Sequence, residues 1–498
     1  MLKSLAKSRL ALALATIVGL TGCGAGTYVG AARPAGSGSG GSTTPAPGTT
    51  STPAPGATST PAPGRTSTPV PGTTSTPTPG ATSTPSAGTT GTPSAGGNAA
   101  SGIPFPSATD ADPFYAQPSP FPAVSHGTIL ASRSVTFAPN GVTMSNVAYQ
   151  VKFASRDIYG RKIAAVETVV EPLVPATGVE PLVVEALAED SLAAKCAPSH
   201  FVTGSAMSDT ELAEESGVPE TSLTAGDTLL FPDFEGPFSL YAVGPQEGYI
   251  TLDAEIAALN FAPLGLNAKT PIGQNGYSGG AHAVSWAAAL APTYAPSLNL
   301  IGTATGGTPA DILGILENID GTSVLSVTAN SLFFDIIFMS GVGINRGFPN
   351  LLTPVLNAKG VAAATAMENG CGGDNSDGSS GPTGHFADYV TLSQSAFYAD
   401  PLVISNTSAD SEPQPGIFPT SNVFLYQSVT DELIPVAGAD KLDAGWCADG
   451  TPLEYFRDTA GGDHVTTEID NIPIVETYLQ ERFAGLPLVL PPTTTTCN

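Results

Sequence analysis

A serine flanked by glycines, in the run Gly276-Tyr277-Ser278-Gly279-Gly280, stands directly before an alanine-rich segment at 282–290. A sharp turn from a strand into a helix strains its central residue and needs very small neighbours, so that backbone and helix can approach the serine. The pattern Gly-x-Ser-x-Gly also arises by chance in a chain with 56 glycines, and Pro271 and Gly273 interrupt the expected strand. The run therefore predicts an exposed serine nucleophile, and its partners have to support it.

An acid and a histidine are expected downstream of such a serine, in that order. The chain has five histidines, two of which precede the serine. His282 lies one helical turn past it and is expected to pack or cap, and His385 falls in a presumed insertion. His464 is left as the general base. Asp431 follows a predicted strand and is the expected acid, with Glu432 as the alternative.

Short β-rich runs alternate with helical patterns from residue 103 onward. This alternation predicts an α/β fold with a mostly parallel central sheet covered by helices on both faces. The expected strands are 147–153, 166–170, 182–187 and 422–427, and the expected helices are 251–259, 282–290 (stopped before Pro292) and 474–483. An apolar run at 332–339 and a Gly/Asp/Ser-rich loop around Cys371 interrupt the alternation. The segment from about 312 to 405 is therefore predicted to be an inserted, largely helical cap.

Several separated motifs together resemble the secretory lipases of the lipase A type. The likeness begins at Asp112-Pro113-Phe114-Tyr115 and runs almost to the C-terminus, although the cap differs in sequence. It includes Glu189-Asp190, Cys196-Ala197-Pro198-Ser199, Asp233-Phe234-Glu235-Gly236, Gly276 to His282, Tyr294-Ala295-Pro296, Gly306-Gly307-Thr308-Pro309, Asp431-Glu432 with Pro435, and His464. The resemblance implies an α/β-hydrolase fold and an enzyme that cleaves triacylglycerols or other carboxylic esters.

A triad of Ser278, Asp431 and His464 suits this chemistry, which requires no cofactor. The resemblance adds an oxyanion hole made by the backbone N–H groups of Gly279 and Asp190. A loop at 374–378 lacks the further ligands of a calcium loop, so no metal is expected.

The cysteines other than Cys23 number four, and spacing alone leaves three pairings open. The resemblance implies that Cys196 pairs with Cys371 and Cys447 with Cys497.

The N-terminal region predicts export. Basic residues precede an apolar run at 10–20, which is too short to span a bilayer, so residues 1–22 are expected to be a cleaved signal peptide. The run ends in Leu20-Thr21-Gly22-Cys23, which resembles a bacterial lipobox. Cys23 is then expected to be acylated and to anchor the protein to the cell envelope, with an ordinary signal-peptidase site as the alternative. Residues 23–102, rich in Pro, Thr, Ser and Gly, predict a disordered linker before a folded domain at 103–498.

Acidic residues outnumber basic ones 43 to 17, which gives a net charge of -26. Such a surface repels phosphate backbones, so nucleic acid is not expected as a partner.

A lipid or a small ester is the expected substrate. Phe334 and Ile337 in the cap are expected to line an acyl channel, unless the run at 332–339 is only a buried helix. Three alternatives stay open: a peptidase or acyltransferase with the same triad, a short-chain carboxylesterase, and an inactive surface binding module.

Overall fold

The computed structural model describes residues 103–107, 109–205, 217–321, 327–348, 351–368, 371 and 385–497, with only the backbone for 321 and 327–335. The expected signal peptide, Cys23 and the linker lie outside the described residues.

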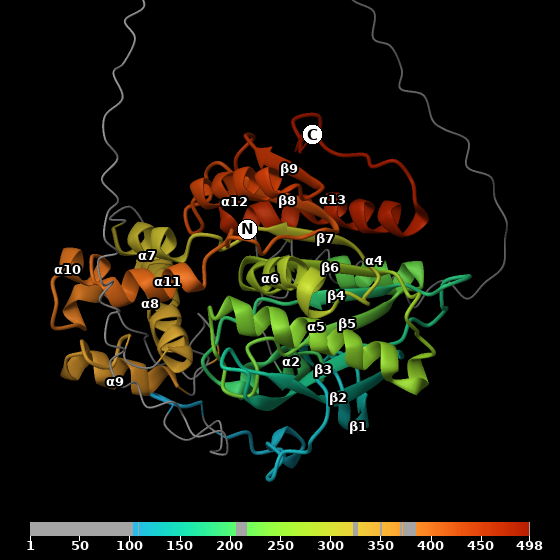
Figure 1. Cartoon of the computed structure of the whole chain (residues 1–498), viewed down its shortest axis with the longest axis horizontal. Coiled ribbons are helices and arrows are strands. Elements are labelled where there is room, and N and C mark those ends of the chain that lie inside the picture. The colour runs from blue at the N-terminus through green and yellow to red at the C-terminus, as the bar shows by residue number, and fades with distance from the viewer. Residues whose placement is uncertain are drawn as a thin grey trace, which may run out of the picture. The chain divides into compact units, whose positions relative to one another are not determined.

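Within the described residues, ten strands form one sheet in the order β1-β2-β3-β5-β4-β6-β7-β8-β9-β10 (Figure 1). The strands are β1 (Ile129–Thr136), β2 (Val147–Arg156), β3 (Lys162–Val170), β4 (Leu182–Ala186), β5 (Thr228–Pro232), β6 (Ile272–Tyr277), β7 (Leu300–Gly306), β8 (Asn422–Ser428), β9 (Leu453–Asp458) and β10 (Thr495–Thr496). The run from β5 through β9 is parallel, whereas β1, β2, β3 and β10 pair antiparallel at the two sides. The centre of the sheet is therefore parallel, as predicted.

Helices cover both faces of the sheet. On one face lie α5 (Gly244–Asn260), α6 (Ser278–Tyr294) and α12 (Val436–Asp449), and on the other lie α2 (Pro198–Phe201), α4 (Gly217–Ala225) and α13 (His464–Ala484). Alternation along β4 explains the two cores, because Leu182 and Val184 pack under α5 while Val183 packs on the opposite face. Both faces of β4 are fully buried, which is typical of a central parallel strand.

Two helix boundaries expected from the sequence are wrong, and each lies next to a proline. The helix α6 does not stop before Pro292 but continues through it to Tyr294. Likewise α13 begins at His464, not at 474, and contains Pro473. An internal proline removes one backbone hydrogen bond, and packing against the sheet outweighs that local loss in both helices.

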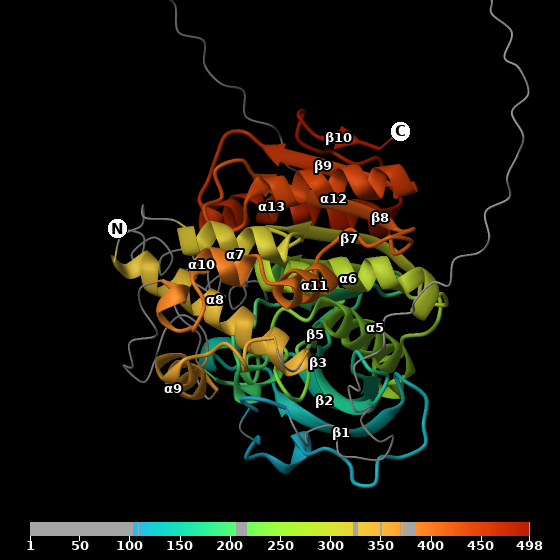
Figure 2. The same ribbon diagram turned by 60° about the vertical axis from the view of Figure 1, so that its left-hand side comes forward.

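Among the described residues between β7 and β8, five α-helices form the cap: α7 (Ile312–Gly321), α8 (Val327–Gly347), α9 (Ala358–Met367), α10 (Gln394–Tyr398) and α11 (Pro401–Ala409). They lie together at one side of the sheet in both views (Figures 1 and 2). Their apolar side chains share a core of their own, which also takes in Leu192, Leu433 and Ile434 from loops of the sheet. The described residues between 312 and 409 are thus largely helical, and they pack on the loops that follow β4 and β8. No helix in the described part of the chain is long and apolar enough to cross a bilayer.

Two disulfides are present in the structure, with the pairing that the resemblance implied. Cys196 is bonded to Cys371, and residue 371 also forms a β-bridge with Ser191. Cys447 is bonded to Cys497, next to the pairing of β10 with β9. The first bond ties the cap to the loop after β4, and the second holds the C-terminal segment to α12.

Two carboxyl groups are fully buried beside the central strands. Burial raises the pKa of Glu185 to about 8, although a hydrogen bond from Asn275 opposes the shift. Burial likewise raises the pKa of Glu255 to about 8, against a hydrogen bond from Gln274. Each acid therefore stays largely neutral between about pH 4.5 and pH 8, where an exposed glutamate is ionised.

These raised pKa values predict that the fold is most stable in acid. The stabilising contribution is fully present below the ordinary glutamate pKa of 4.5 and is lost as pH rises through about 8. Each acid should lower the free energy of unfolding by about 1.4 kcal/mol per pH unit within that window. Melting temperatures of the wild type and of Glu185→Gln/Glu255→Gln between pH 4 and pH 9 test this.

The double variant should show the flatter pH dependence, because glutamine keeps the acceptor oxygen but does not titrate. Asp449→Asn, at an exposed acid, is the control and should follow the wild type. Parallel curves for all three proteins would contradict the assignment of the pH dependence to the two buried glutamates.

Candidate active site

The predicted serine turn exists where β6 meets α6. Ser278 has φ = 51°, in the left-handed region that non-glycine residues rarely adopt. A Cβ on Gly276 would lie 2.4 Å from backbone atoms of Gly280, and one on Gly280 would lie 1.7 Å from the carbonyl oxygen of Ala186. Because no side chain fits at either position, both glycines are required by the geometry. The residues 272–277 do form a strand, and Pro271 lies just before it.

His464 connects the serine to an acid. Its Nε2 lies 2.9 Å from Ser278 Oγ, and its Nδ1 lies 2.8 Å from Asp431 Oδ2. The ring is nearly buried, and the Asp431 carboxylate is fully covered. Tyr277 donates a hydrogen bond to the carbonyl oxygen of His464, and Asp463 caps α13, so the first residue of that helix is held in place.

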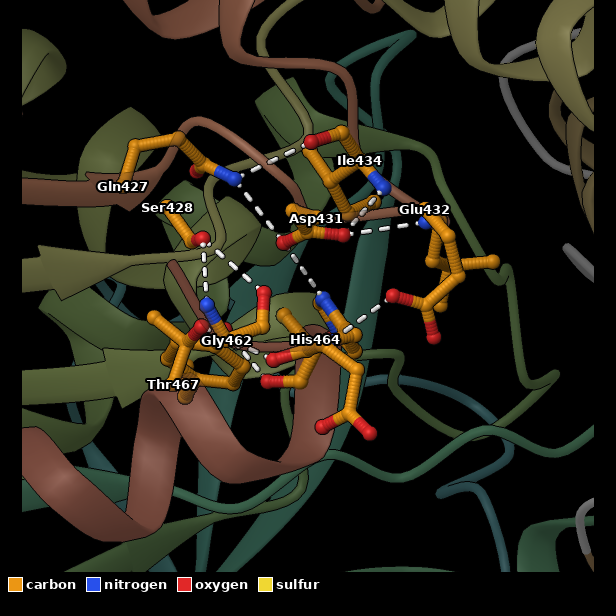
Figure 3. A network of polar contacts seen from close by, with 12 residues as sticks. Gln427, Ser428, Asp431, Glu432, Ile434, Gly462, His464 and Thr467 are labelled. Carbon is orange, nitrogen blue, oxygen red and sulfur yellow. Dashed lines mark hydrogen bonds and ion pairs between the residues drawn. The ribbon is translucent and has the colours of Figure 1, made fainter. Parts of the chain in front are cut away.

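The Asp431 carboxylate is held from several sides (Figure 3). Gln427 donates to its Oδ2, while the backbone N–H groups of Leu433 and Ile434 donate to its Oδ1. The alternative acid, Glu432, instead accepts a hydrogen bond from the backbone N–H of His464. The structure therefore brings Asp431, and not Glu432, to the imidazole ring.

The other four histidines lie elsewhere, each near an acid. His126 pairs with Asp253, His200 with Asp110, His282 with Glu247, and the exposed His385 lies 3.9 Å from Asp320. His282 is buried, and although burial lowers its pKa, the Glu247 carboxylate outweighs that effect and raises the pKa to about 9. The expectation that His282 packs is met, but as one half of a buried ion pair.

The two residues expected at the oxyanion hole adjoin each other. Asp190 also has a positive φ, 31°, and its Oδ1 lies 3.5 Å from the point where a Cβ on Gly279 would stand. Tyr241 donates a hydrogen bond of 2.9 Å to the same Oδ1. No quoted motif contains Tyr241, so the sequence analysis missed this contact.

A cavity of about 40 Å³ lies beside Ser278. One wall is apolar and comes mainly from the cap: Ile312, Ile315, Leu316, Ile336, Leu433 and Ile434. The polar part of the lining carries Glu189, Glu235, Glu247 and His282. Ser278 therefore lies between an apolar and a polar part of the cavity lining.

Two acids on the polar wall are buried without a partner for some of their oxygens. Among the described residues, neither carboxyl oxygen of Glu189 has a hydrogen-bond partner, and Oε2 of Glu235 has none. Burial first, and neighbouring carboxylates second, raise the pKa of both glutamates well above the ordinary value. Burial thus favours the neutral form of both acids beside the cavity, and both belong to motifs that carry the resemblance but had no role assigned from the sequence.

The described residues offer one group of three potential metal ligands close together, Asp443, Cys447 and Cys497. The two cysteines form a disulfide, and a disulfide sulfur is not the thiolate that binds metal. The loop at 374–378 lies outside the described residues.

Known proteins resemble this chain over most of its length. Residues 204–490 match the family described as secretory lipase. A secreted triacylglycerol lipase of Malassezia furfur is 30% identical over 380 residues, or 75% of this chain and 76% of that protein. A protein of Mycobacterium tuberculosis named a probable inactive lipase is 29% identical over 76% of this chain and 83% of its own length. Candida antarctica lipase A in its closed state superposes with a TM-score of 0.66 at 23% identity, over 77% of this chain and 88% of that structure. That structural likeness shows the α/β-hydrolase fold.

Proposed function

The chain belongs to the secretory lipase family, and from this we propose that it is a serine hydrolase that cleaves triacylglycerols and other carboxylic esters through an acyl-enzyme. The observation that carries the proposal is the pair of contacts made by His464, to Ser278 Oγ on one side and to Asp431 on the other. The named activity of the Malassezia relative supports the choice of substrate.

The proposed reaction follows from this geometry. An alcohol is a poor nucleophile at neutral pH, so His464 takes the proton of Ser278 as its oxygen attacks the ester carbonyl. Asp431 fixes the imidazole tautomer and stabilises the cation that forms. The backbone N–H groups of Gly279 and Asp190 then stabilise the oxyanion, each by about 3–4 kcal/mol. His464 returns the proton to the leaving alcohol, and a water molecule activated by the same histidine releases the acid.

Organophosphonate labelling combined with an ester profile tests the proposed activity. We expect one label per chain, placed on Ser278, and hydrolysis of both p-nitrophenyl butyrate and a triolein emulsion. A peptide amide and added alcohol acceptors distinguish a peptidase or an acyltransferase. The absence of both labelling and hydrolysis would favour the inactive binding module, which is relevant because one relative is named as inactive.

The apolar wall of the cavity is proposed to bind the acyl chain. Of the two residues expected there, Ile337 is buried in the cap core but does not line the cavity, and the side chain of Phe334 is not described. Ile336, directly before Ile337 in the chain, does line the cavity. Burial of each methylene contributes about 0.8 kcal/mol, or roughly a fourfold preference per methylene.

Ile336→Asp is therefore expected to lower kcat/KM for decanoate esters at least tenfold more than for acetate esters. Stopped assays over ester chain lengths measure this, with melting temperature recorded for each variant. Leu402→Asp, at a position that is 54% exposed on α11, is the matched control and should leave the profile unchanged. An equal loss at every chain length in folded Ile336→Asp would favour a short-chain carboxylesterase whose cap does not select acyl chains.

Export and anchoring form a further part of the proposal. The segment before Cys23 has the charge and length of a bacterial lipoprotein signal, and relatives are named as secreted. We therefore expect the full chain, made in a bacterial host, to incorporate an alkyne-tagged fatty acid and to partition into detergent. Cys23→Ala should abolish both, and labelling that survives this change would contradict the assignment of the anchor.

A further inference from the structure

One arginine of the cap reaches into the loops beside the active site. Arg346 lies near the end of α8 and is only 3% exposed. Its Nε donates to the carbonyl oxygen of Phe105 at 2.7 Å, and its Nη1 lies within 3.0 Å of the carbonyl oxygens of Leu192, Phe238 and Ser239. Each of these contacts ends on a backbone carbonyl group.

Two of the loops held in this way meet at Asp190. Leu192 is two residues beyond Asp190, in the loop after β4. Ser239 is two residues before Tyr241, whose hydroxyl donates to the Asp190 carboxylate. Asp190 and Ser239 both have positive φ, 31° and 44°, so both loops adopt backbone conformations that need support from their surroundings. The guanidinium of Arg346 supplies that support to both at once.

The end of α8 that carries Arg346 is packed closely on the same loops. A Cβ on Gly343 would lie 2.1 Å from the carbonyl oxygen of Tyr241, so only glycine allows the helix to lie this near. On the loop that carries Asp190, Ser191 forms a β-bridge with Cys371. Cys371 is also disulfide-bonded to Cys196, farther along the same loop. The segments of the cap around residues 343–346 and at 371 thus hold the Asp190 loop from more than one side.

Burial of a charge is unfavourable unless hydrogen bonds compensate for it. Burial lowers the pKa of Arg346 to about 10, which leaves the guanidinium protonated at neutral pH. A planar fork with five N–H donors can bind several carbonyl groups in a fixed geometry, which neither an apolar side chain nor a lysine can do. The arrangement is therefore suited to fix the relative position of two loops.

We propose that Arg346 is a positioning residue for the oxyanion hole, and that the part of α8 around it is a fixed wall of the active site. Through Leu192 it holds the loop that carries the Asp190 N–H, and through Ser239 it holds the loop that carries Tyr241. We expect this end of α8 to stay in place while substrate binds. The inference rests on the proposed function, since it assumes acyl transfer at Ser278.

Kinetics of Arg346→Met and Arg346→Lys test the proposal. Active sites are titrated to completion with an organophosphonate, so that rates refer to folded, competent enzyme. On p-nitrophenyl butyrate we expect Arg346→Met to lower kcat about 10- to 100-fold with KM within about twofold of the wild type, because a misplaced donor loses transition-state stabilisation. The inhibition constant of an alkyl trifluoromethyl ketone, which forms an oxyanion on the serine, should rise by the same factor. For Arg346→Lys, both kcat and the inhibition constant should lie between the values of the wild type and those of Arg346→Met.

Two further variants keep the test decisive. Tyr241→Phe removes only the hydrogen bond from the tyrosine hydroxyl to Asp190 and leaves Arg346 in place. It should raise the inhibition constant of the trifluoromethyl ketone severalfold, and it can be measured even if Arg346→Met fails to fold. Arg482→Met, at a partly buried arginine paired with Glu454, is the control for general destabilisation and should leave kcat unchanged.

Unchanged kcat and unchanged ketone affinity per titrated site, in Tyr241→Phe and in either folded Arg346 variant, would overturn the inference and reduce Arg346 to a structural tie. Failure of the proposed function is a different result, because the wild type itself would then neither react with the phosphonate nor hydrolyse the ester.

Discussion

Replacement of Ser278 by alanine is expected to lower kcat for ester hydrolysis by about 10⁶-fold, and His464→Ala should be about as severe. In the proposed mechanism the Ser278 oxygen forms the acyl bond, and Nε2 of His464, 2.9 Å away, takes its proton. Because the two act as a unit, the double variant should be hardly slower than either single one. Burst and steady-state rates on a soluble p-nitrophenyl ester measure the effect.

Folding has to be tracked in both variants. Alanine at 278 keeps the same left-handed backbone conformation as serine, so melting temperatures near that of the wild type are expected. His385→Ala is the matched control, since this histidine is exposed and lies in the cap region away from Ser278. Rates near the wild-type value in either Ser278→Ala or His464→Ala would refute the assignment of the nucleophile or the base.

The second large effect is expected for Asp431→Asn, which should lower kcat about 10⁴-fold. The Asp431 carboxylate accepts from Nδ1 of His464, whereas an amide can present an N–H there and favour the wrong tautomer. Glu432→Gln is a closely matched comparison, because the Glu432 carboxylate accepts a hydrogen bond from the backbone N–H of His464 and not from its ring. Its loss should stay below about tenfold. A greater loss in Glu432→Gln than in Asp431→Asn would show that the acid is wrongly assigned.

Local patterns were sufficient to predict the features that depend on neighbours in the chain. The glycines around Ser278 reflect contacts within a few residues of the turn and with the adjacent strand, so their presence in the sequence already indicates the turn. The alternation of strands and helices predicts the parallel sheet, because a helix that connects two parallel strands lies between them in the sequence. The chain order of serine, acid and histidine then singled out Asp431 and His464.

Contacts between distant segments could not be predicted in this way. Arg346 lies 154 residues from Leu192, and nothing in its local sequence distinguishes it from an exposed helical arginine. The periodicity of the cap run did not separate Ile336, which lines the cavity, from Ile337, which does not. Helix ends near Pro292 and Pro473 were wrong for the same reason, since tertiary packing and not local preference decides them.

The order of these residues along the chain has a consequence for biosynthesis. Ser278 precedes His464 by 186 residues, and at ribosomal rates of about 5–20 residues per second the histidine is made roughly 10–40 s after the serine. The strand β8 and the helix α13, which carry the acid and the base into place, are among the last parts of the fold to be translated. Under the proposed mechanism, a nascent chain therefore holds the serine without its general base, and hydrolysis is expected only after translation has passed the start of α13.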